Sequence, residues 1–200
     1  MSAKHLQAGC AVLLLLLAGC KPVPTAPDPD DGGSGDSNRT YSNADWGFSI
    51  SPPTDSLWSV SATQFRAIRE PNGLSPVQVI MRRVDFGLPA RPIFILDSFG
   101  ATQTETLEEV ADSFDARFSA DFQNYNTQGQ RVPGTVGGVS SVEWRFFARE
   151  PAAGLRVGHN LYLSVVFVKG DQIYAALCSG DAEEFPEDAF RTILGSFVFD

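Results

Sequence analysis

The feature that most restricts the fold is a pair of apolar segments joined by a short turn. Residues 161–168 are apolar at both odd and even positions, which is typical of a strand covered on both faces. Gly170-Asp171 then predicts a two-residue hairpin turn into a second strand over residues 173–178. The sequence therefore predicts a central antiparallel hairpin with other elements packed on both sides.

Further strands are predicted from alternating or β-branched and aromatic composition, bounded by turn residues. Val142, Trp144, Phe146 and Ala148 alternate with polar residues, which places one face inward. Gly134, Gly137 and Gly138 are interpreted as turn residues. The other predicted strands are 46–50 with a continuation at 57–60, 65–69, 77–84 and 197–199, with a turn at Pro71-Asn72-Gly73.

Two helices are predicted. Thr106 begins the first, and Glu109 completes a capping box three residues later. Its apolar stripe predicts a face packed on a sheet, with a ligand cavity as the alternative; the stripe consists of Leu107, Val110, Ala111, Phe114, Phe118 and Phe122. Pro186 opens the second helix and Gly195 ends it. Residues 41–200 are thus expected to form one α+β domain, an antiparallel β-sheet flanked by helices.

The N-terminal segment predicts a lipoprotein leader. Lys4 precedes an apolar run, and Leu17-Ala18-Gly19-Cys20 places small residues directly before a cysteine. This tetrapeptide resembles the bacterial lipobox. The resemblance implies that Leu17, Ala18 and Gly19 are recognised for cleavage and that Cys20 receives the lipid. Residues 1–19 are the expected signal peptide, because the run from Ala8 to Cys20 is too short for the roughly 20 residues of a membrane span.

Residues 20–40 are expected to form a disordered tether. They are rich in Pro, Gly and Asp and almost free of large apolar side chains. The cluster of aspartates between Asp28 and Asp36 lacks the full carboxylate pattern of a calcium loop, so a solvated linker is the preferred interpretation. Lys21 directly after the cysteine favours the outer membrane over retention in the inner membrane.

The order of elements resembles the PsbP/Mog-like α/β/α sandwich families, which include DcrB-like bacterial lipoproteins. The resemblance rests on Trp46-Gly47-Phe48-Ser49-Ile50 with Pro52 and Trp58, the long middle helix, the apolar hairpin, and the ending 190–197. It covers residues 45 to 200. It implies a binding or scaffold module with no shared catalytic residues.

The remaining composition excludes several classes of function. The formal net charge is −9, and without residues 1–19 the chain has 14 basic and 24 acidic side chains, which argues against nucleic-acid partners. His159 is then the one remaining histidine, so no multi-histidine metal site can form, and no cofactor motif is present. Cys178 is expected to be an inert core thiol. The acidic run at the start of the second helix is expected to be solvated; it consists of Glu183, Glu184, Glu187 and Asp188.

Together these patterns predict a non-catalytic envelope lipoprotein, anchored in a membrane by its lipid, that binds an envelope protein partner or acts as a scaffold. Two alternatives stay open. The first is a small-ligand-binding lipoprotein with an apolar pocket beside Phe114 and Phe118. The second is an unrecognised hydrolase built around His159, for which the sequence offers no positive support.

Overall fold

The computed structural model describes residues 39–85, 92–101, 105–149 and 160–200. Within these ranges it contains ten strands and two helices. In chain order they are β1 (Tyr41–Asn43), β2 (Phe48–Ile50), β3 (Trp58–Gln64), β4 (Val77–Arg83), β5 (Ile93–Gly100), α2 (Leu107–Asp121), β6 (Gln123–Val136), β7 (Val139–Arg149), β8 (Asn160–Lys169), β9 (Gln172–Asp181), α3 (Glu187–Gly195) and β10 (Val198–Phe199).

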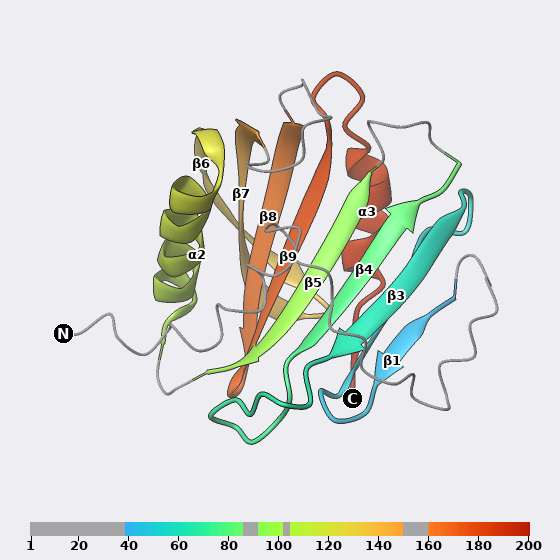
Figure 1. Ribbon diagram of the computed structural model, residues 1–200, viewed down its shortest axis with the longest axis vertical. Coiled ribbons are helices and arrows are strands. Elements are labelled where there is room, and N and C mark those ends of the chain that lie inside the picture. Colours follow the sequence, from blue (N-terminus) through green and yellow to red (C-terminus); the bar gives the residue numbers. More distant parts are fainter. Residues whose placement is uncertain (1–38, 86–91, 102–104, 150–159) are drawn as a thin grey trace.

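The main sheet has seven antiparallel strands in the order β3-β4-β5-β9-β8-β7-β6 (Figure 1). The apolar hairpin predicted from the sequence is confirmed as β8 and β9, which occupy the middle of this sheet. Lys169 pairs with Gln172 across the turn, and Gly170 has a φ of 62°, which suits a residue without a Cβ. Residues 162–167 of β8 are all buried, as expected for a strand covered on both faces.

The two faces of the sheet are covered by different elements. On one face, α2 packs against β6, β7 and β8, and we call this the α2-side face (Figure 1). On the other, the α3-side face, α3 shares a buried cluster with a small sheet of strand order β1-β2-β10. The predicted α+β class, an antiparallel sheet flanked by helices, is therefore confirmed.

Each face has its own apolar core. The α3-side core contains Trp46, Phe48, Trp58, Tyr174 and Phe190, all at most 1% exposed. The α2-side core is largely aromatic and is built from the helix stripe and the inward column of β7. Its rings include Phe114, Phe118, Phe122, Trp144, Phe146 and Tyr162. The interpretation of the stripe as a packing face is thus confirmed.

Several predicted strands are corrected. Residues 65–69 form a turn, in which the Ile68 amide donates to the Phe65 carbonyl at 2.9 Å, because β3 has already ended at Gln64. Residues 58–60 do not continue β2; they begin β3 in the other sheet. Gly134 lies within β6, whereas Gly137 and Gly138 do form the predicted turn. Strands β1, β5 and β6 were not predicted.

The predicted capping box of α2 is confirmed. The Glu109 amide donates to Thr106 Oγ1 at 3.2 Å, and the Thr106 amide donates to the Glu109 carboxylate at 2.8 Å. We expect Thr106→Ala to lower the free energy of unfolding by about 1 kcal/mol, because it removes this acceptor from the first turn. Thr106→Ser should keep most of the stability. Urea unfolding of the three proteins checks this, and equal midpoints would contradict it.

Candidate functional site

The residues predicted to direct lipidation are Leu17, Ala18, Gly19 and Cys20, and they lie outside the described residues, as does His159. The predicted tether lies almost entirely outside them too. The sites that the structure does describe are therefore on the domain itself.

Asp97 is a buried carboxylate in the middle of the main sheet. It lies on β5, on the α2-side face, is 2% exposed, and pairs in register with Gln78 of β4 and Ala175 of β9. Gln78, also 2% exposed, donates from Nε2 to Asp97 Oδ1 at 2.7 Å. Loss of solvation by burial raises the pKa of Asp97 to about 7, although the hydrogen bond from Gln78 and the charge of Arg117 act in the opposite direction.

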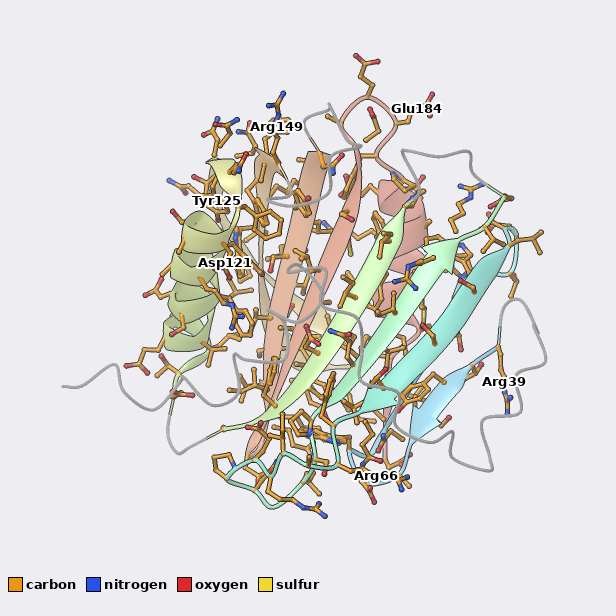
Figure 2. All side chains as sticks on the ribbon, in the orientation of Figure 1. Arg39, Arg66, Asp121, Tyr125, Arg149 and Glu184 are labelled. Carbon is orange, nitrogen blue, oxygen red and sulfur yellow. The ribbon has the colours of Figure 1, made fainter. Side chains whose placement is uncertain are left out.

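Arg117 brings a positive charge from α2 toward this carboxylate. Its side chain is 11% exposed and forms an ion pair with Asp121 one turn later, Nε to Oδ2 at 3.2 Å (Asp121 is labelled in Figure 2). Both terminal nitrogens of Arg117 are buried and donate to no partner among the described residues. Ser164 on β8 likewise has a buried hydroxyl without a described partner. Arg117 and Ser164 are thus buried polar groups in an otherwise apolar layer, of the kind that ordered water molecules often satisfy.

The outer strand of the same face carries exposed hydroxyl groups. Ser59, Ser61 and Thr63 are exposed on β3, and α2 does not extend over this strand (Figure 1). Ser59 and Ser61 donate to the carbonyls of Arg82 and Ile80 on β4, both at 3.4 Å, which is long for a hydroxyl donor. The α2-side face is therefore aromatic and covered by α2 at β6–β8, whereas at β3 it is polar and has no described helix over it.

The charged side chains on the opposite side tie elements together. Arg191 of α3 donates two hydrogen bonds to Glu143 of β7, and Arg145 of β7 pairs with Glu187 of α3. The pKa of Arg191 is raised, mainly by the hydrogen bond to Glu143. Glu187 belongs to the acidic run interpreted as solvated, so one of its four members is instead an ion-pair partner. The charges of these four side chains therefore join α3 to β7, which is a structural role.

Cys178 and the helix stripe have the roles expected of core residues. Cys178 is completely buried, and burial raises the pKa of its thiol well above the usual value, so the reactive thiolate is disfavoured. Phe114 and Phe118 lie ring to ring, with centroids 6.1 Å apart, and Phe118 stacks on Phe146 at 5.4 Å. The stripe therefore packs against other aromatic side chains of the α2-side core.

Neither a metal-binding cluster nor a membrane span can be found in the described parts of the chain. No three His, Cys, Asp or Glu side chains gather there in a way that could hold a metal ion. No helix within those ranges is both long and apolar enough to cross a bilayer.

Comparisons with known proteins relate this chain to others through structure. No family model matches the sequence, and no curated protein matches it. The solution structure of cyanobacterial PsbP (CyanoP) from Synechocystis sp. PCC 6803 covers 90% of this chain and 100% of its own, with 14% identity and a TM-score of 0.52. The fold is PsbP-like.

A second solved structure, a protein of unknown function from Pseudomonas aeruginosa, covers 80% of this chain and 95% of its own at 8% identity, with a TM-score of 0.48. The PsbP structure, with its TM-score of 0.52, confirms the resemblance in the order of elements at the level of the PsbP-like fold. At such low identities the likeness concerns the fold alone.

Asp97, Gln78 and Arg117 were not singled out from the sequence. Asp97 interrupts the apolar run Ile93-Phe94-Ile95-Leu96, and a charged residue inside a strand-like run was the available signal. Its partners could not be predicted in this way, because Gln78 comes from a neighbouring strand and Arg117 from a helix on top of the sheet.

Proposed function

We propose that this chain is a non-catalytic lipoprotein of the bacterial envelope, whose PsbP-like domain acts as a protein-binding or scaffold module. The observation that carries the proposal is Leu17-Ala18-Gly19-Cys20 at the end of a short apolar leader. Acylation of Cys20 would anchor the domain, and the segment 20–40 would hold it clear of the lipid headgroups. Lys21 favours the outer membrane.

The chemistry of the described residues supports a scaffold better than an enzyme. Arg191, Glu143, Arg145 and Glu187 bind one another between α3 and β7 and do not converge on an open site. The buried Asp97 is held by Gln78 inside the sheet. In the described part of the chain, β3 ends the main sheet and carries no charged side chain. Surfaces of this kind bind other polypeptides through their backbone groups.

The first test replaces the proposed lipidation residue. We expect cells that express the full chain and are fed labelled palmitate to incorporate label into the wild-type protein and into Cys10→Ala, but not into Cys20→Ala. The reason is that Cys20 supplies the thiol at the proposed modification site, whereas Cys10 lies inside the leader that is removed. The mature wild-type protein should begin at residue 20 and carry acyl mass by mass spectrometry.

The matched control is Cys10→Ala, since it removes a thiol from the same segment. An unacylated wild-type protein, or equal labelling of Cys20→Ala, would overturn the proposed anchoring. Loss of label in both variants would show that the leader itself had been damaged, and Cys10→Ser would then replace the control.

A further inference from the structure

The two edges of the main sheet differ sharply in how they are protected from other chains. β6 is broken by register shifts between Gln123 and Asn126 and between Gln128 and Val132, and it contains Pro133. Bulges, prolines and charges are the usual devices that stop an edge strand from pairing with another molecule. Arg131 of this strand pairs with Asp112 and Asp115 of α2 and so ties the strand to the helix. The β6 edge is therefore unsuited to pairing.

β3 has none of these devices. Its seven residues pair with β4 without a shift in register, and they contain no proline and no charged side chain. The ladder continues beyond both ends, because the Val84 amide donates to the Leu57 carbonyl and the Phe65 amide to the Pro76 carbonyl, both at 2.9 Å. β3 is thus a regular strand without charged side chains. Because Leu57 and Phe65 bond to β4, the backbone groups of Val60 and Ala62 point away from β4, whereas the Gln64 carbonyl already accepts the Arg66 amide at 3.1 Å.

The sequence of this edge is complementary to itself. If two copies pair antiparallel with Ser61 opposite Ser61, then Ser59 faces Thr63 on the α2-side face and Val60 faces Ala62 on the other. Paired hydroxyls and paired small apolar side chains are both favourable across strands. A two-fold axis requires this property, since each copy presents the same surface to the other.

Charge and exposed apolar surface favour the same arrangement. The chain has a formal net charge of −9, so copies repel one another least where acidic groups are few. β3 itself has no charged side chain, and an acidic group, Asp45, lies at its end, where it accepts a hydrogen bond from Gln64 at 3.4 Å. Leu57 is 49% exposed, one of the large apolar side chains most open to solvent. In this register it would face Phe65 of the partner, which packs at the edge of the α2-side core.

We propose that two copies of this chain associate through β3, paired antiparallel about a two-fold axis at Ser61, so that their main sheets join into one. The proposed partner of β3 is thus the same strand of a second copy of this chain. The inference rests on the proposed function in one respect: anchoring both copies in one membrane raises their effective concentration and lets a modest interface be populated.

The test is disulfide trapping in membranes of cells that express the full chain. Directly opposed antiparallel residues have Cα atoms about 4.5–5.5 Å apart, which is within the range of a disulfide. Ser61→Cys should therefore give a reducible dimer on mild oxidation. Ser59→Cys should not, because each copy's residue 59 lies about four residues from the other, roughly 13 Å along the strands. Mixing Ser59→Cys with Thr63→Cys should restore the dimer.

The wild-type chain is the control for disulfides formed by its own cysteines, of which Cys178 is buried. A second variant avoids dependence on trapping: Ser61→Lys should weaken association at least tenfold by placing like charges opposite each other, while Ser61→Thr should preserve it. Absence of a Ser61→Cys dimer, or an equal dimer from Ser59→Cys, would overturn the proposal. Acyl labelling is measured separately from dimer formation. A labelled chain that gives no dimer refutes only the pairing through β3. An unlabelled chain that gives the dimer refutes only the lipid anchor.

Discussion

Asp97→Asn will remove most of the loss of stability that the wild-type domain shows as the pH rises from about 4 to about 7. Burial raises the pKa of Asp97 to about 7 in the folded protein, whereas an unfolded Asp titrates near 3.9. The folded state therefore holds this proton to a higher pH than the unfolded state does. The resulting stability is complete below pH 4 and is lost as the pH rises through 7.

The expected size is large for a single group. A difference of about three pKa units corresponds to on the order of 4 kcal/mol over this window, so Asp97→Asn should exceed the wild type in stability at pH 8. An amide keeps the shape of the carboxyl group and can still accept the hydrogen bond from Gln78. Urea unfolding at pH 4, 6 and 8 measures the effect.

Asp171→Asn is the matched control, because Asp171 is exposed in the β8–β9 turn. It should leave the pH profile close to that of the wild type. If Asp97→Asn and the wild type lose stability in parallel from pH 4 to pH 8, then Asp97 is not a desolvated carboxylate and its description above is wrong.

The second large effect is expected at the centre of the aromatic core, where Phe118→Ala should lower the free energy of unfolding by about 3–5 kcal/mol. Phe118 is 2% exposed, and its ring contacts those of Phe114, Phe122, Trp144 and Phe146. Truncation leaves a cavity that stiff neighbouring rings fill poorly. Chemical unfolding followed by tryptophan fluorescence reports the change, because Trp144 lies beside this ring.

Val198→Ala serves as the control for Phe118→Ala, since Val198 is 59% exposed and should change stability by less than about 0.5 kcal/mol. A similarly small change in Phe118→Ala would mean that α2 is only loosely held against β6, β7 and β8. In that case a ligand pocket beside the helix stripe would again become the better interpretation.

The elements that were predicted correctly are those marked by turn or capping residues close to them in the chain. The β8–β9 hairpin was predicted because Gly170-Asp171 suits a tight turn, and α2 because Thr106 and Glu109 cap each other. β6 was missed because it is largely exposed and shows little apolar alternation. Residues 65–69 were mistaken for a strand because two apolar side chains, Phe65 and Ile68, point into a core from a turn.

The sequence alone determined the α+β class, the central hairpin and both helices, because turn chemistry, capping and periodicity act between residues close in the chain. It also supplies the prediction of a lipidated Cys20, which depends on a short contiguous motif. Only the tertiary structure decided that Asp97 meets Gln78 within reach of the charge of Arg117, and that β3 is an edge strand of the described sheet. Both depend on which distant segments become neighbours, and strand order is set by the packing of the whole sheet.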